Sequence, residues 1–170
     1  MKQANLNCLD VSGNPIQRDG KLALGQVLNG ADIERLVVDL GNPSVPTLLD
    51  ANATKLNFDT STHCLGPDDT IVLAGWITAL RPQKTLTAVD LSGHALVGAS
   101  GNQQVALSLD ETGFLHLCEN MRKTQCTEVK LQGCHFTSRA AESLAIMLQS
   151  ETLTKLDIAD NEGIACEINK

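Results

Sequence analysis

The chain has 170 residues, of which 42% are hydrophobic and 19% charged, and its formal net charge at pH 7 is −7. This composition is typical of one globular domain and excludes a disordered chain. The basic surface that phosphate binding requires is missing, which excludes a nucleic-acid partner. No apolar run approaches the roughly 18 residues of a membrane span, and the start MKQANLNCLD lacks a signal-peptide segment. We therefore expect a cytoplasmic protein with no membrane contact.

The first predicted element is a strand inside the phrase CLDVSGNPI, residues 8–16, which belongs to a recurring pattern. Written from Leu6, the apolar residues and the turn residue follow L-x-x-L-x-V-x-x-N-x-I. The same offsets recur along the chain, so a strand is expected at each copy. The six copies start near residues 6, 33, 53, 86, 126 and 153.

Helices are expected between most of these strands. The first runs from Asp19 or Gly20 to Leu28, and the stretch 45–52 is too short for more than about one turn. Pro67 and the acids after it open a second helix to residue 80. The fourth interval between copies is longer than the others, and its additional residues, 96–109, are expected to form an inserted β-hairpin, with an irregular loop as the alternative. A helix over 110–123 follows. A last helix starts at Thr137 or Ser138 and ends near residue 150.

The pattern resembles the leucine-rich repeat, and the long intervals with helices resemble its ribonuclease-inhibitor-like type. The resemblance implies an α/β fold: a horseshoe-shaped solenoid of about six repeats. A parallel β-sheet lines its concave face, and helices or turns form its convex face. Asn14, Cys134 and Asn161 match the turn residue of the family, whereas Gly41, Ser61 and His94 depart from it. We expect one leucine-rich repeat domain over residues 1–170, cut from a longer protein or stacked end to end, because neither end shows a capping unit.

No constellation of residues predicts catalysis, a metal site or a cofactor. His63 and Cys64 are adjacent, but neighbouring side chains of an extended segment point in opposite directions and do not form a nucleophilic pair. Cys126 and Cys134 occupy the first and ninth positions of one copy, too far apart for a shared metal or a disulfide. The irregular spacing of the six cysteines favours reduced thiols. A secreted precursor would favour disulfides instead.

What remains is a surface formed by the third, fifth and seventh positions of each copy, which point away from the core. The resemblance implies a non-enzymatic scaffold, and the aspartates on this surface favour a basic protein partner. The alternatives are a plain solvated face, a segment that self-associates end to end, and a regulatory repeat region of a larger enzyme or receptor. The candidate partner-binding residues are Asp10, Arg35, Asp39, Lys55, Asp59, Asp90, Glu128, Lys130, Lys155 and Asp157.

Overall fold

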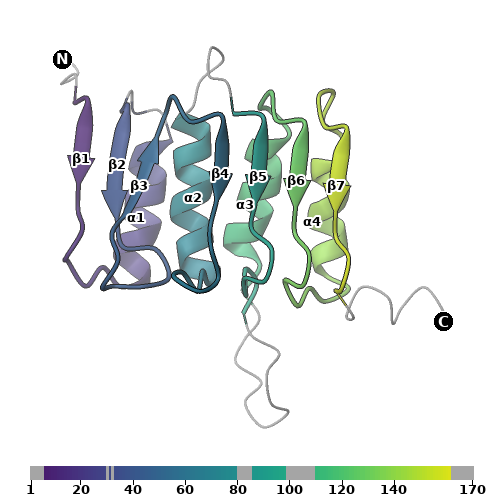
Figure 1. Cartoon of the computed structure of the whole chain (residues 1–170), viewed down its shortest axis with the longest axis horizontal. Coiled ribbons are helices and arrows are strands. Elements are labelled where there is room, and N and C mark those ends of the chain that lie inside the picture. Colours follow the sequence, from purple (N-terminus) through teal and green to yellow (C-terminus); the bar gives the residue numbers. More distant parts are fainter. Residues whose placement is uncertain (1–5, 30, 32, 80–85, 99–109, 162–170) are drawn as a thin grey trace, which may run out of the picture.

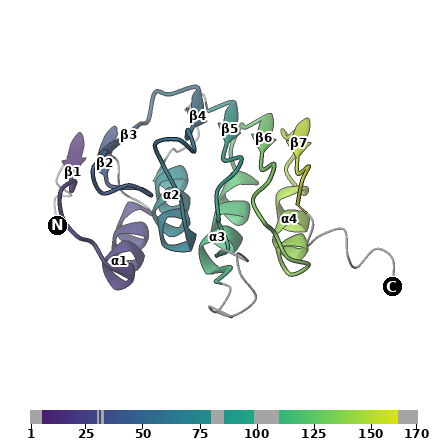
Figure 2. The ribbon, with the colours of Figure 1, turned by 60° about the horizontal axis from the view of Figure 1, so that its bottom comes forward.

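The structure is a computed structural model that describes residues 6–29, 31, 33–79, 86–98 and 110–161. In this part of the chain the strands form one layer and the helices lie together on one side of it (Figure 1 and Figure 2). The elements, in chain order, are β1 (Cys8–Asp10), α1 (Arg18–Leu28), β2 (Arg35–Val38), β3 (Thr47–Asp50), β4 (Lys55–Asn57), α2 (Pro67–Ala79), β5 (Ala88–Asp90), α3 (Thr112–Met121), β6 (Glu128–Lys130), α4 (Ala140–Met147) and β7 (Lys155–Asp157).

The strands predicted from the recurring phrase are present at the predicted places. β1, β2, β4, β5, β6 and β7 each begin two residues after one of the expected starts. They pair in parallel within each sheet and in matching register, so that Leu56, Val89, Val129 and Leu156 lie side by side. A parallel ladder of this kind requires a return segment between consecutive strands, and helices supply it between β1 and β2 and from β4 onward.

One hydrophobic core lies between the strands and the helices. Leu36 and Val129 in its strand row are almost fully buried, whereas Leu9 and Leu156 at the two ends of the row are only partly buried. The core is filled mainly by leucine, valine, isoleucine and alanine, as the scarcity of aromatic residues requires. The inward side chains of the copies therefore share a single interior.

The expected horseshoe of six repeats on one parallel sheet is not confirmed, because β3 interrupts it. The strands form a three-stranded sheet, β1-β2-β3, and a separate four-stranded sheet, β4-β5-β6-β7. β3 pairs antiparallel to β2, where the sequence predicted a short turn of helix. The reason is alternation: Thr47 and Leu49 are buried while Leu48 between them is exposed, which is the period of a strand.

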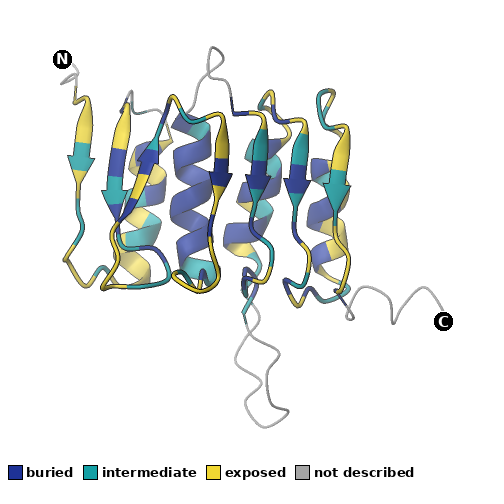
Figure 3. Ribbon diagram, in the orientation of Figure 1, coloured by how far each residue is buried: buried dark blue, intermediate teal, exposed yellow. Residues whose placement is uncertain are grey.

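The four helices lie close to the predicted ranges. α2 is buried on all sides because α1 and α3 pack against it from both flanks (Figure 3). Its contact with α1 is a close approach of two backbones: a Cβ added to Gly75 would meet the Gly25 carbonyl oxygen at 2.3 Å. Only glycine fits this crossing. Most of the expected hairpin near 96–109 lies outside the described residues; its first residues, 96–98, form no strand.

The ninth position of three copies ties each strand end to the preceding copy. The side chain there donates a hydrogen bond to a backbone carbonyl of that copy, which would otherwise be buried without a partner. His94 fills this role as well as the expected residue types do, because Phe58 O can only accept and His94 Nε2 therefore carries the hydrogen. The pairs are Asn161 with Leu131 O (2.8 Å), Cys134 with Leu91 O (3.1 Å) and His94 with Phe58 O (3.0 Å).

Candidate protein-binding site

The strand face, defined here as the side chains of β1–β7 that point away from the helices, carries the candidate residues. In β4–β7 the third positions Lys55, Ala88, Glu128 and Lys155 form one row. The fifth positions form a second row, which joins Asn57, Asp90, Lys130 and Asp157 by the same register. Neighbouring side chains in such rows are about 5 Å apart, close enough to interact.

Four candidate residues form an ion-pair network across β5, β6 and β7. Lys130 Nζ lies 3.2 Å from Asp90 Oδ2 and 4.0 Å from Glu128 Oε1. Lys155 Nζ lies 2.7 Å from Glu128 Oε1, and its hydrogen bond lowers the pKa of Glu128. Partial burial raises the pKa of Asp90, but hydrogen bonds from Ser92 and Lys130 outweigh it and the net shift is downward. The network presents both signs of charge in a fixed order.

The aspartates of the strand face are turn residues as well as surface charges. Asp10 and Asp90 each accept the backbone N–H of the residue two positions later, at 3.0 and 3.1 Å. Asp59 does the same with Ser61, at 2.9 Å, and the backbone and hydroxyl of Ser61 lower its pKa. This contact holds the chain as it leaves the strand. These three carboxylates therefore also hold the turns after their strands, and their role in binding a partner stays a prediction.

Asp39 is also occupied. Its Oδ2 accepts the Gly13 N–H at 2.8 Å, and its Oδ1 is buried with no hydrogen-bond partner among the described residues. Asp39 and Asp59 lie beyond the ends of β2 and β4, outside the strand rows. The strand face thus brings together the candidates on β5–β7. Lys55 lies in the same row, beyond Ala88, and its charge helps lower the pKa of Glu128. Asp10 and Arg35 lie apart, because β3 separates them from β4.

β3 adds residues to the strand face that the sequence analysis missed. Leu48 lies opposite Val37 in the antiparallel register and is 56% exposed. Asp50 lies opposite Arg35 one step further along. The centre of the face therefore carries an apolar spot between two charged regions. The alternation in residues 47–50 was the available signal, but the polar Thr47 at an inward position concealed it.

A cavity lies near the carboxyl ends of β1 and β2, beside the first turns of α1 and α2. Its volume is about 850 Å³, and charged residues line it. Arg18 forms ion pairs with Asp68 and Asp110, and Lys21 forms one with Asp69. These pairs hold α1 against its neighbours and leave no basic group in the cavity unpaired. The sequence analysis had assigned the acids of α2 only to the start of that helix.

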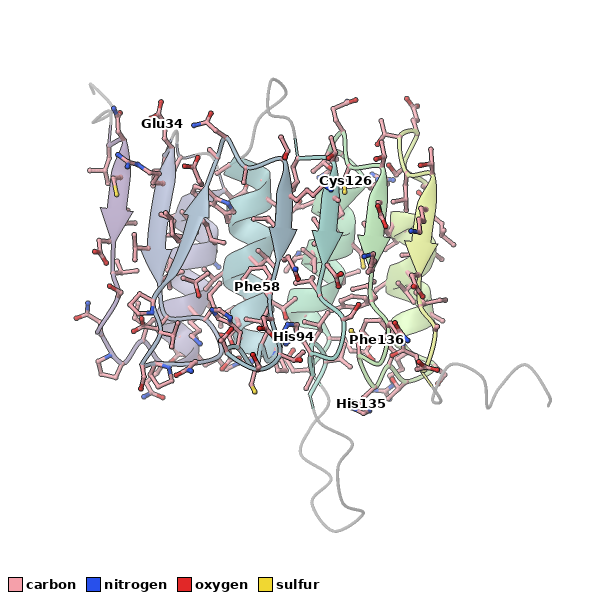
Figure 4. The ribbon with its side chains drawn as sticks, viewed as in Figure 1. Glu34, Phe58, His94, Cys126, His135 and Phe136 are labelled. Carbon is pink, nitrogen blue, oxygen red and sulfur yellow. The ribbon has the colours of Figure 1, made fainter. Side chains whose placement is uncertain are left out.

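The cysteines and histidines do not form a reactive site. His63 and Cys64 line different cavities, and His63 Nδ1 lies 2.8 Å from the hydroxyl of Thr62. Burial raises the pKa of Cys126, and it raises the pKa of Cys134 to about 11, so both thiols stay protonated. Figure 4 shows Cys126 at the beginning of β6, far from His94 at the end of β5. Cys126, Cys134 and His94 pack the interior, whereas Cys64 is exposed.

The part of the chain that the structure describes holds no group of three metal-binding side chains. Among the same residues, no helix has both the length and the apolar character that crossing a bilayer demands. A family model for the leucine-rich repeat matches residues 2–25 and 149–165. No curated protein matches the chain. The family match supports a leucine-rich repeat protein, a class whose domains generally mediate protein–protein interaction.

Proposed function

We propose that the protein is a non-enzymatic scaffold, built from repeats of the ribonuclease-inhibitor-like type, that binds a protein partner on the strand face of β4–β7. The observation that supports this proposal is the network of Asp90, Glu128, Lys130 and Lys155. Exposed ion pairs stabilise a fold very little, so the network is not explained by folding alone. Ordered charges of both signs instead select a partner and orient it during encounter.

The partner is a folded protein with a matching row of charges. The rows of β4–β7 hold three acids and three bases, which favours mixed complementarity over the purely basic partner that the aspartate count suggested. Asp90 and Glu128 attract bases, while Lys130 and Lys155 attract acids. The proposed site therefore discriminates by the order of charges along the rows, because a like charge placed opposite any of them would weaken binding.

A charge swap tests this proposal and keeps the shortest ion pair of the network, while it removes the 4.0 Å contact of Lys130 with Glu128. The double variant Glu128→Lys with Lys155→Glu keeps an opposite pair at the 2.7 Å contact but reverses its direction on the face. We expect unfolding by urea to be unchanged within about 0.5 kcal/mol. Capture of partners from source-cell extract, quantified by mass spectrometry, should fall about tenfold or more for the specific partner.

The control swaps two exposed residues of opposite charge away from the strand face. Lys123→Glu with Glu151→Lys exchanges two charges that border a different hollow, after α3 and α4. This control should capture the same proteins as the wild type. If the strand-face swap and the control retain every partner equally, the strand face is not the binding surface.

A second candidate function is end-to-end self-association. Exposed apolar side chains gather at the first and last elements: Val27 of α1 is 66% exposed, and Leu148 at the end of α4 is 62% exposed. Head-to-tail contact of one end with the other would bury them, and such a contact extends into filaments unless it closes.

A further inference from the structure

The two sheets meet at a break between β3 and β4, where neither strand is paired with the other. The Cα atoms of these strands lie mostly more than 8 Å apart. Two strands that flank a third are separated by roughly 10 Å, twice the spacing of paired strands. The break is therefore wider than the spacing of paired strands, which an inserted strand requires.

Both strands turn unpaired backbone groups toward the break. In the parallel ladder Phe58 donates to Asp90 O, so Lys55 and Asn57 direct their N–H and C=O groups to the edge away from β5. On β3, Ala51 donates to Glu34 O, and the antiparallel alternation leaves Leu48 facing the break. No backbone hydrogen bond from the described residues reaches Leu48, Lys55 or Asn57 across the break. Two exposed strand edges thus face each other, a ready template for strand addition.

Beneath the break lies a cleft of about 320 Å³ between β3 and β4. Two buried polar atoms that line it have no hydrogen-bond partner among the described residues: Thr47 Oγ1 and His63 Nε2. Thr47 is only 8% exposed, and Phe58 packs edge-on against the His63 ring with the ring centres 5.9 Å apart. Buried polar groups without partners are rare and costly, which points to a ligand group that satisfies them.

We propose that the break accepts an extended segment of a partner protein as an additional strand between β3 and β4. The segment pairs with both edges, parallel to one strand and antiparallel to the other. This inference rests on the proposed function, since the strand would belong to a protein bound on the strand face. The partner would then be recognised through main-chain hydrogen bonds as well as through surface charges.

The surroundings specify three positions within four consecutive residues of the segment. The inward side chain level with Thr47, next to the residue beside Leu48, points into the cleft and carries a hydroxyl, so serine or threonine satisfies Thr47 Oγ1 and His63 Nε2. One outer side chain lies beside Leu48 and is apolar. The other lies beside Lys55, which forms no ion pair with the described residues, whereas Asp50 has Arg35 opposite it. Charge complementarity therefore places an acid there.

The probe is a phage-displayed library of seven-residue peptides with a fixed centre, acid–x–apolar–hydroxyl, where x is any residue, in both chain directions. We expect selection of such peptides by the wild-type protein, and protection of the Leu48, Lys55 and Asn57 amides from hydrogen exchange in their complexes. Lys55→Pro removes a donor at the break and no bond to β5, and should weaken the selected peptides about tenfold. Thr47→Val should weaken them about fivefold or more.

Two further variants keep the test decisive. Cys8→Pro alters the first, exposed residue of β1, the counterpart of Lys55 on a strand edge outside the break, and should leave affinity unchanged. Lys55→Glu keeps the backbone N–H and should prefer peptides in which lysine replaces the acid. This variant provides the test if Lys55→Pro fails to fold.

The inference is overturned if the wild type and Lys55→Pro bind the selected peptides with equal affinity. It is also overturned if bound peptides protect amides elsewhere than at the break, or if the selection does not enrich peptides with the fixed centre. If the Glu128 and Lys155 swap abolishes partner capture while the break variants do not, the proposed function stands and only the inserted strand is excluded.

Discussion

Because the hydroxyl of Thr47 has no partner among the described residues, we expect its removal to stabilise the protein, whereas most core substitutions destabilise a protein. Thr47 is 8% exposed, and its Oγ1 has no hydrogen-bond partner among the described residues. Leaving a buried hydroxyl unsatisfied costs about 1–3 kcal/mol. Valine has nearly the same shape and no hydroxyl, so Thr47→Val should stabilise the free protein by about 1 kcal/mol. In a chain of this size the melting temperature should rise by roughly 2–4 °C.

Thr70 provides the matched control inside the same molecule. Its side chain is fully buried, but its Oγ1 donates to Gly66 O at 2.8 Å. Thr70→Val loses this bond, so stability should fall by about 1 kcal/mol. Urea unfolding followed by far-UV circular dichroism measures both variants. If Thr47→Val is as destabilising as Thr70→Val, the Thr47 hydroxyl is already satisfied in the free protein and the argument for a ligand at the break fails.

Two further predictions concern pH and the ends of the array. Burial lowers the pKa of His94 below its ordinary 6.5, so the unfolded chain takes up the proton first as the pH falls through 6.5. Stability should therefore be highest above about pH 6.5 and decrease below it; His94→Asn should flatten this dependence between about pH 5 and 7, whereas the exposed His116→Asn should keep it. Static light scattering should show a mass that rises with concentration and becomes constant in Val27→Lys with Leu148→Lys; a constant mass for the wild type contradicts end-to-end association.

The sequence predicted the strands best, because their signal is local. Alternating inward residues such as Leu36 and Val38 fix both the strand and the face it buries. The same logic located the helices within a few residues. It failed at β3, where Thr47 is polar at an inward position and the strand runs antiparallel. The pairing of strands depends on contacts between distant segments. The break between β3 and β4 follows from that pairing, so no single stretch of the sequence predicts it.

The candidate site was predicted in part for the same reason. The columns of outward residues follow from period two, and the register confirms them within each sheet. The pattern Asp-x-Ser at Asp10, Asp59 and Asp90 was visible in the sequence as a turn signal, but the charge of the aspartates was read as a surface property alone. Cross-strand pairs such as Lys155 with Glu128 required the register.

The central claim is that a partner lies across the outward side chains of β4–β7. Amide chemical-shift mapping of the protein with its captured partner tests this directly. The account predicts the largest changes at Asp90, Glu128, Lys130 and Lys155, with α2, α3 and α4 nearly unchanged on their outer surfaces. Changes concentrated on the helices, with those four residues unaffected, would contradict it.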